Sequence, residues 1–277
     1  MMPTMPPKTT HDLPDRATRE RLRTVAIEAA RRAGAILDGY ARNGFRIEHK
    51  DALNLVTDAD THSEQAIVET IGRTFPDHEI LAEERGRAGS RSPFKWIIDP
   101  LDGTTNFAHG FPAYAVSIGV EYQGRCILGV VLDPTRQELF VGEAGVGATV
   151  NGKPIHVSRT PKLDGSLLVT GFAYDIRVSK QNNLDHFANF AVRTQGVRRM
   201  GAAAIDLCYV ACGRFDGFWE LKLHPWDTAA GSVIVIEAGG RMSDFGGAPF
   251  SIYGQEMIAS NGLIHDEMVE VLNRPSV

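Results

Sequence analysis

The chain of 277 residues has few cysteines, no long apolar run and no excess of positive charge. Cys208 and Cys212 stand four apart on an expected helix, but no other Cys or nearby His completes a metal-ligand set with them. We therefore expect these two and Cys126 to be free thiols of a cytoplasmic protein. No apolar run approaches the roughly eighteen residues of a membrane span. The net charge of −5 gives no general attraction to nucleic acid.

The composition, with 43% hydrophobic and 23% charged residues, is that of an ordinary globular protein. A chain of this length can bury a large core and divide into two subdomains. Residues 1–15 are polar, lack the apolar core of a signal peptide, and are expected to form a flexible N-terminal tail. We expect an N-terminal α+β subdomain over residues 16–160 and a C-terminal α/β subdomain over residues 161–277.

The first subdomain changes from helical spacing to strand spacing along its length. Apolar residues at helical spacing predict one amphipathic helix over 17–41. Thr61-His-Ser-Glu64 has the pattern of a capping box and predicts the start of a second helix. Short apolar runs from 113 to about 157 predict an antiparallel meander, with Asn151-Gly152 as a hairpin turn.

The second subdomain alternates strands and helices. The expected strands cover 166–170, 215–220 and 257–259, and the expected helices cover 181–192, 202–211, 228–238 and 263–272. This alternation predicts an α/β arrangement with partly parallel strand pairing.

The stretch Asp99-Pro-Leu-Asp102-Gly-Thr-Thr-Asn-Phe107 follows an apolar run that predicts a buried strand. Two carboxylates three residues apart suit Mg²⁺, which proteins hold with a few carboxylates and the phosphate of the substrate. Gly103 and Thr104 follow where a helix could start, and backbone amides at such a start suit the phosphate itself. Taken alone, the stretch could equally be a strand that ends in an Asp-Pro turn with Asp102 as a helix cap.

Acidic residues in other motifs extend this pattern: Asp60 in Leu53-Asn-Leu-Val-Thr-Asp-Ala-Asp60, Glu83 in Leu81-Ala-Glu-Glu84, and Asp227 in Trp226-Asp-Thr-Ala-Ala-Gly231. Each one alone has an ordinary structural explanation, as a helix-dipole carboxylate, a solvated strand end and a helix N-cap, respectively. If they converge with Asp99 and Asp102, two carboxylates at ~5 Å repel by roughly 3 kcal/mol. Convergence therefore predicts divalent cations, and oxygen ligands alone favour Mg²⁺ over Zn²⁺.

The order and spacing of these motifs resemble the inositol monophosphatase family, within the lithium-sensitive, magnesium-dependent phosphatases. The resemblance covers roughly residues 21–272 and is strongest to bacterial members, through Arg198-Arg-Met-Gly-Ala-Ala-Ala204 and Gly217-Phe-Trp-Glu220. It implies an α-β-α-β-α sandwich, of mixed α+β and α/β character, with the active site between its two halves.

The resemblance also implies the roles of the acidic residues. Glu83 and Asp99 would hold one Mg²⁺ with the main-chain carbonyl of Leu101, and Asp99, Asp102 and Asp227 would hold a second. A third ion would be held by Glu83 and waters. Asp60 and the hydroxyl of Thr104 would form a dyad that positions the attacking water and accepts its proton.

On the substrate side, the amides of Gly103 and Thr104 are expected to bind phosphate, beside the metal ligands Glu83, Leu101, Asp102 and Asp227. The resemblance places Gly201, Ala202, Ala203 and Glu220 against the sugar-alcohol ring and Arg198 near the substrate. For Gly201 a plain turn, and for Glu220 and Arg198 a surface charge, are equally good explanations. Many relatives have Ser or Thr where Ala202 stands and after the second glutamate, where this chain has Arg85.

The reaction that follows is hydrolysis of a phosphate monoester by a metal-activated water, with inositol monophosphate or a similar small phosphorylated polyol as substrate. Relatives that act on fructose 1,6-bisphosphate, histidinol phosphate or phosphoadenosine phosphates supply the alternatives. A covalent aspartyl phosphate is disfavoured, because that class needs Asp-x-Asp and this chain has Asp99-x-x-Asp102. We also expect a homodimer and inhibition by Li⁺. A role as an RNA- or polymerase-associated binding factor is the alternative of another class, unsupported by the net charge.

Overall fold

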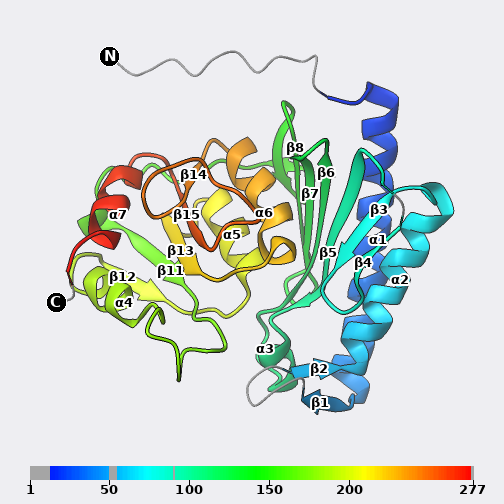
Figure 1. Cartoon of the computed structure of the whole chain (residues 1–277), viewed down its shortest axis with the longest axis horizontal. Coiled ribbons are helices and arrows are strands. Elements are labelled where there is room, and N and C mark those ends of the chain that lie inside the picture. Colours follow the sequence, from blue (N-terminus) through cyan, green and yellow to red (C-terminus); the bar gives the residue numbers. More distant parts are fainter. Residues whose placement is uncertain (1–12, 50–54, 90, 276–277) are drawn as a thin grey trace.

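Alternating layers of helices and sheets make up the described chain (Figure 1), which a computed structural model defines over residues 13–49, 55–89 and 91–275. The expected α-β-α-β-α sandwich is confirmed. The expected flexible tail lies almost wholly outside the described residues. None of the helices in the described part of the chain is long and apolar enough to span a membrane.

The outer helical layer packs on one face of the larger sheet and consists of α1 (Arg16–Asn43) and α2 (Asp58–Thr74). The larger sheet runs, edge to edge, β10 (Lys153–Pro154), β9 (Gly147–Val150), β8 (Glu138–Glu143), β7 (Arg125–Asp133), β6 (Ala115–Tyr122), β5 (Phe94–Asp102), β3 (Glu79–Ala82) and β4 (Gly86–Ala88). Its neighbours are antiparallel except for β3 and β5, which run parallel. The expected meander is therefore present, and Asn151-Gly152 forms the turn between β9 and β10, both residues having positive φ.

The middle layer consists of α5 (Ala203–Ala211) and α6 (Pro225–Glu237), buried between the two sheets. The smaller sheet follows, in the order β12 (Gly196–Arg198), β11 (Leu167–Thr170), β13 (Gly217–Leu221), β15 (Glu256–Ser260) and β14 (Arg241–Ser243). Strand β11 pairs in parallel with β12 and β13, and β15 pairs antiparallel with β13 and β14. The expected partly parallel pairing is confirmed. The last layer is α4 (Leu184–Ala191) and α7 (His265–Leu272), packed on the far face.

Four short elements of the described residues lie outside these layers. The strands β1 (Ile47–His49) and β2 (Leu55–Thr57) form a small antiparallel pair near α3 (Thr104–Ala108), and the 3₁₀ turn η2 (Leu163–Gly165) precedes β11.

Helix α2 begins earlier than the capping box at Thr61 predicted, and this correction bears on the site. The helix starts at Asp58 with Thr57 as N-cap, and the backbone N–H of Thr57 donates to Asp60 Oδ2 at 2.7 Å. The pattern Thr-x-x-acid occurs twice, at Thr57 and at Thr61, and only the first is used. Asp60 therefore lies in the first turn, where the helix dipole favours a negative charge.

Helix α6 lies directly on the backbone of the larger sheet, over three glycines that are neighbours across adjacent strands. Gly119 of β6 pairs with Gly129 of β7, which pairs with Gly142 of β8. A Cβ atom on Gly129 would lie 2.1 Å from the carbonyl oxygen of Ala230, and one on Gly142 would lie 2.7 Å from Ile234 Cα. We call these three residues the glycine track; any side chain there would push α6 away from the sheet.

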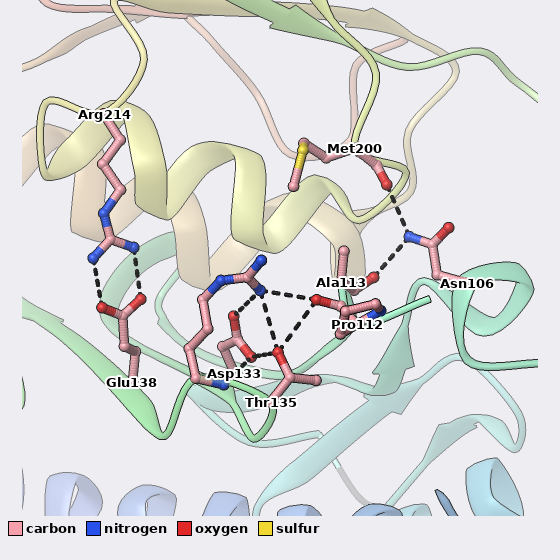
Figure 2. Close-up of polar contacts among 9 residues, drawn as sticks. Asn106, Pro112, Ala113, Asp133, Thr135, Glu138, Met200 and Arg214 are labelled. Atoms are coloured by element: carbon pink, nitrogen blue, oxygen red, sulfur yellow. Dashed lines mark hydrogen bonds and ion pairs between the residues drawn. The ribbon is translucent and has the colours of Figure 1, made fainter. Parts of the chain in front are cut away.

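Polar contacts of the segments just before and just after α5 also join the two halves of the molecule (Figure 2). The side-chain amide of Asn106, in α3, donates to the carbonyl oxygens of Ala113 at 2.7 Å and Met200 at 2.8 Å. The guanidinium of Arg214 pairs with the Glu138 carboxylate, with an Nη1 to Oε2 distance of 2.6 Å. The segment before α5 is thereby tied to the helix that follows the Asp99–Asp102 motif. The division at residue 160 remains a prediction.

Candidate active site

Strand β5 supplies two of the predicted metal ligands, Asp99 and Asp102, which are 2% and 8% exposed. Pro100 has no N–H to give to the sheet, and the register between β5 and β6 shifts between Asp99 and Asp102. Within this irregular turn the backbone N–H of Leu101 donates to Asp99 Oδ1 at 3.0 Å. The proline thus separates the two aspartates without ending the strand.

Glu83 comes from the neighbouring strand. It directly follows β3, which is parallel to β5, so the carboxyl ends of the two strands lie at the same edge of the sheet. Its backbone N–H donates to the Ile98 carbonyl at 3.2 Å. The strand order therefore brings Glu83 beside Asp99.

A buried glutamate on α2 holds the loop that carries Glu83. Glu64 is 1% exposed, and its Oε2 accepts the backbone N–H groups of Glu84 at 2.9 Å and Arg85 at 3.4 Å. The Arg85 guanidinium lies 3.0 Å from Glu64 Oε1. Many relatives have Ser or Thr at the position of Arg85. In this chain the arginine forms an ion pair with Glu64 instead.

Asp227 approaches from the other half of the molecule. It stands in the first turn of α6, where Pro225 occupies the first helical position. Its Oδ2 accepts the backbone N–H of His224 at 2.7 Å. The helix begins three residues before the expected start at 228, so Asp227 lies within the first turn.

These four carboxylates share one cavity of about 280 Å³, which Leu101, Gly103, Thr104, Tyr174, His224 and Trp226 also line. Burial raises the pKa of Asp99 well above its ordinary value, and Glu83, Asp102 and Asp227 raise it further. Burial likewise raises the pKa of Asp102 and of Asp227 to about 7. Four of the ten lining residues are acidic, so the cavity is strongly negative when these groups are ionised.

The donor set of this cavity fits Mg²⁺. It offers carboxylate and carbonyl oxygens, and the mutual repulsion of its acids favours a bound cation. Among the described residues no three His, Cys, Asp or Glu side chains already stand in a ready ligand arrangement. The assignment of individual ligands therefore remains a proposal that rests on the shared cavity and its charge.

The structure brings the two residues of the predicted dyad, Asp60 and Thr104, together within the first half of the molecule. Thr104 Oγ1 lies 3.2 Å from Asp60 Oδ1 and 3.1 Å from the Leu101 carbonyl oxygen. Asp60 is 0% exposed, and Thr57 fixes its Oδ2 through both its N–H and its hydroxyl, at 2.7 Å and 2.6 Å. Burial raises the pKa of Asp60 to about 6. A carboxylate held in this way can orient a hydroxyl and accept a proton near neutral pH.

A second cavity of about 330 Å³ adjoins the first. The two share Asp102, Gly103, Tyr174, His224 and Asp227 among their lining residues. The predicted substrate contacts Gly201, Ala202, Ala203 and Glu220 all line it. We call it the leaving-group cavity, because it opens beside the metal-ligand cavity and extends into the second half.

Glu220 is the next-to-last residue of β13, lines this cavity and is 8% exposed. Burial raises its pKa to about 8, Asp227 contributes further, and Arg199 opposes the shift. A Cβ on Gly171 would lie 2.2 Å from Glu220 Oε1, so the carboxylate packs directly against that backbone.

The amide groups that open α5 do not all face the substrate. The backbone N–H groups of Ala203 and Ala204 donate to the two oxygens of Asp102, at 3.2 Å and 2.7 Å. Ala203 thus contributes its surface to the cavity while its amide holds a predicted metal ligand. The absence of a hydroxyl at Ala202 leaves the cavity wall apolar there.

The structure does not bring Arg198 to either cavity. Its Nη1 donates to the Val197 carbonyl, and it is Arg199 that lines the leaving-group cavity. Successive residues of an extended segment point to opposite sides, which is why only one of the two arginines can face the site. Sequence reasoning also missed Tyr174 and Lys222, which lie on irregular segments and carry no periodic signal.

The three cysteines are free and contribute to neither cavity. Cys208 is buried in α5, and Cys126 and Cys212 are half-buried. The expectation of free thiols is confirmed.

Comparison with known proteins agrees with this geometry. Residues 18–275 match the model of the inositol monophosphatase family. The chain is 50% identical over 250 residues to an inositol-1-monophosphatase of Synechocystis, covering 90% of this chain and 87% of that protein. It is 44% identical over 246 residues to the Nus factor SuhB of Pseudomonas aeruginosa, covering 86% of this chain and 90% of the relative.

Solved structures show the same fold. The inositol monophosphatase of Anabaena superposes with a TM-score of 0.86 at 46% identity, covering 93% of this chain and 98% of that one. The Thermotoga maritima IMPase superposes with a TM-score of 0.83 at 36% identity, covering 92% of this chain and 97% of that one.

Proposed function

Because the chain belongs to the inositol monophosphatase family and is a phosphatase, we propose that its substrate is inositol monophosphate, which it hydrolyses to inositol and phosphate. Phosphatases of this family generally depend on Mg²⁺. The observation that carries the proposal is the joined pair of cavities, one lined by four carboxylates and one by a buried glutamate.

In this proposal Glu83 and Asp99, with the Leu101 carbonyl, hold one Mg²⁺, and Asp99, Asp102 and Asp227 hold a second. Glu83 and waters would hold a third. When bound, Mg²⁺ neutralises the phosphate, orients it and lowers the pKa of a bound water. Li⁺, similar in size but of half the charge, is expected to inhibit by replacing the second ion.

Thr104 and Asp60 act on the attacking water. Thr104 Oγ1 orients the water and takes its proton as it passes its own to Asp60 Oδ1, which lies 3.2 Å away. As the water oxygen bonds to phosphorus, the P–O bond to the polyol breaks, and the leaving alkoxide takes a proton from water. The raised pKa of Asp60, about 6, brings this base near the working pH. Gly103 and Thr104 also line the cavity where the phosphate would lie, and we expect their amides to donate to it.

The charges of the leaving-group cavity support a neutral polyol over a second phosphate. Of its two basic residues, Lys222 is already paired: its Nζ lies 2.6 Å from Asp175 Oδ2 and 2.8 Å from Ser179 Oγ. Arg199 faces the buried carboxyl groups of Glu220 and Asp206. A second phosphate would have to displace Asp175 from Lys222 or lie beside the buried carboxyl group of Glu220, whereas neutral ring hydroxyls can hydrogen-bond to Glu220.

The test compares phosphate esters with the purified chain in saturating Mg²⁺. We expect inositol 1-phosphate to be cleaved with at least about tenfold higher kcat/KM than fructose 1,6-bisphosphate, and chelation of Mg²⁺ to stop both. Equal turnover of the bisphosphate would refute the substrate assignment. No phosphate release from any ester would refute the activity itself.

A second candidate function, binding to a transcription complex, is favoured by the relatives named Nus factor SuhB. The net charge of −5 points to a protein partner in preference to RNA. An inactive variant that still binds purified RNA polymerase would support this role, and absence of binding by the wild-type chain would refute it.

We also propose a cytoplasmic homodimer. Light scattering of the purified chain at micromolar concentration should give twice the 30.2 kDa mass of one chain.

A further inference from the structure

Tyr174 lies on a loop that reaches from the second half of the molecule to the metal-ligand cavity. The loop follows β11 and is fixed at its start, where the Asn183 side-chain amide donates to the Gly171 carbonyl at 2.7 Å. The rings of Phe172 and Phe187 pack with their centroids 5.9 Å apart. The backbone on the N-terminal side of Tyr174 is thereby held to α4 and its preceding turn.

The other side of the loop is fixed by charge. Asp175, the next residue, accepts from Lys222 Nζ at 2.6 Å, and its carbonyl accepts the backbone N–H of Ser179 at 2.9 Å. Lys222 also donates to the Ser179 hydroxyl at 2.8 Å. Tyr174 is therefore held between two anchored residues and needs no separate closure to reach the site.

The side chain of Tyr174 lines both the metal-ligand cavity and the leaving-group cavity. The residue is 51% exposed, so its ring reaches the site from the solvent side. Its hydroxyl interacts with the Thr105 side chain, next to the Gly103-Thr104 segment. Burial raises the pKa of the phenol to about 12, with Glu83, Asp102 and Asp99 contributing, which places the hydroxyl within the field of three predicted metal ligands.

A protonated phenol at this position is a hydrogen-bond donor without a charge. A phosphate monoester offers only acceptor oxygens, and a lysine or arginine beside four metal ligands would compete with the cations for them. A neutral donor can bind the phosphate without that competition.

We propose that the Tyr174 hydroxyl donates a hydrogen bond to a phosphate oxygen of the bound ester, at the border between the two cavities. This inference rests on the proposed phosphatase reaction and deepens it. It makes Tyr174 a binding residue for the group shared by all substrates, in contrast to Glu220, which would contact hydroxyls found only on polyol esters.

The test is Tyr174→Phe, which removes the hydroxyl and keeps the ring, with Tyr253→Phe as the matched control. Tyr253 is also about half exposed, and its hydroxyl donates to Glu121 at 2.7 Å, away from both cavities. Binding of inorganic phosphate in the presence of Mg²⁺ is measured by calorimetry, and KM and kcat are measured for inositol 1-phosphate and para-nitrophenyl phosphate.

For Tyr174→Phe we expect phosphate binding to weaken by roughly ten- to a hundredfold, the loss of one hydrogen bond to a charged acceptor. KM should rise by a similar factor for both esters, and Tyr253→Phe should stay within about twofold of wild type. Phosphate binding by Tyr174→Phe within twofold of wild type would overturn the proposal, as would a loss confined to the inositol ester.

The phosphate measurement also separates this inference from the proposed function. It reads binding without turnover, so weaker phosphate binding by Tyr174→Phe supports the inference even if inositol 1-phosphate proves a poor substrate. A wild-type chain that cleaves no ester but binds phosphate would count against the proposed reaction alone.

Discussion

The two sides of the site are built differently. On the metal side, the carboxylates lie in or beside regular elements, and backbone N–H groups bind several of them directly, as for Asp99, Asp102 and Asp227. On the leaving-group side, Arg199 lies on an irregular segment and Glu220 is the next-to-last residue of a short strand, and Tyr174, at the border of the two sides, lies on a loop. Most of the positions that perform the reaction are thus fixed by main-chain contacts, whereas Arg199 and Glu220, which face the leaving group, depend on a loop and on the end of a short strand.

Substitution of Asp99 should break the metal side most completely. Asp99→Asn is expected to lower kcat/KM by at least about a thousandfold, because it removes a charge that should hold both ions. The chelated protein should be equally stable or more stable, since a repelling carboxylate is lost. Steady-state kinetics and thermal unfolding check both, with Asp185→Asn, exposed on α4, as control. An active Asp99→Asn protein would refute the two-ion site.

A double-mutant cycle should show that Asp60 and Thr104 act as one unit, because their losses in kcat should not multiply. Asp60→Asn and Thr104→Ala are each expected to lower kcat by roughly a hundredfold, and the double variant by little more, because one proton passes through both residues. Multiplicative losses would show that the two act independently. Single turnover in water labelled with oxygen-18 should place the label in phosphate, with no trapped phospho-enzyme.

On the leaving-group side, Glu220→Gln should separate substrates. We expect kcat/KM for inositol 1-phosphate to fall by roughly ten- to a hundredfold, with para-nitrophenyl phosphate spared, because only the polyol donates hydroxyls to the carboxylate. Arg199→Lys and Arg198→Lys form a matched pair: the first should follow Glu220→Gln in part, and the second should have no effect. If Glu220→Gln slows both esters equally, Glu220 supports the metal side.

The contacts of Glu64 that hold the loop of Glu83 can be weakened without removing a metal ligand, and the expected effect is smaller. Glu64→Gln keeps one acceptor oxygen for the backbone but loses the ion pair with Arg85. We expect the Mg²⁺ concentration for half-maximal activity to rise about tenfold, with kcat at saturating Mg²⁺ nearly restored. Arg87→Gln, which disturbs the Glu79 pair on the neighbouring strand, is the control. An unchanged Mg²⁺ requirement would show that Glu83 needs no support from α2.

The smallest effect concerns pH and stability without metal. The raised pKa values of Asp102 and Asp227, about 7, mean that the folded protein keeps protons that the unfolded chain has released. Their contribution to stability is fully present below pH ~4 and is lost as the pH rises through ~7. In chelator, the Tm of wild type should fall a few degrees more than that of Asp227→Asn between pH 5 and 8. If the Tm of the two proteins falls equally with pH, the pKa of Asp227 is not raised in the folded protein.

The contrast between the sides also describes what the sequence could predict. The acidic residues were found because the order and spacing of their motifs together resemble the inositol monophosphatase family, although each motif alone has an ordinary structural explanation. Asp60 was found as a site residue although its helix start was misplaced, since Thr57 and Thr61 begin similar patterns. Arg199 and Tyr174 were missed, because which side an irregular loop presents depends on contacts far away in sequence, such as Asp175 with Lys222.

The glycine track determines which parts of the site can change without loss of activity. The track lets the backbone of α6 lie directly on the backbone of the sheet. The distance between Asp227 on the helix and the aspartates of β5 is therefore set by the main chain, with no side chain between the two layers. Exchange of the segment that carries Arg199 leaves this distance unchanged and keeps Tyr174 for the phosphate. New leaving groups can therefore be sought by exchanging the Arg199 segment, while a methyl group added at Gly129 would push α6 and Asp227 away from the sheet and lower activity toward every substrate.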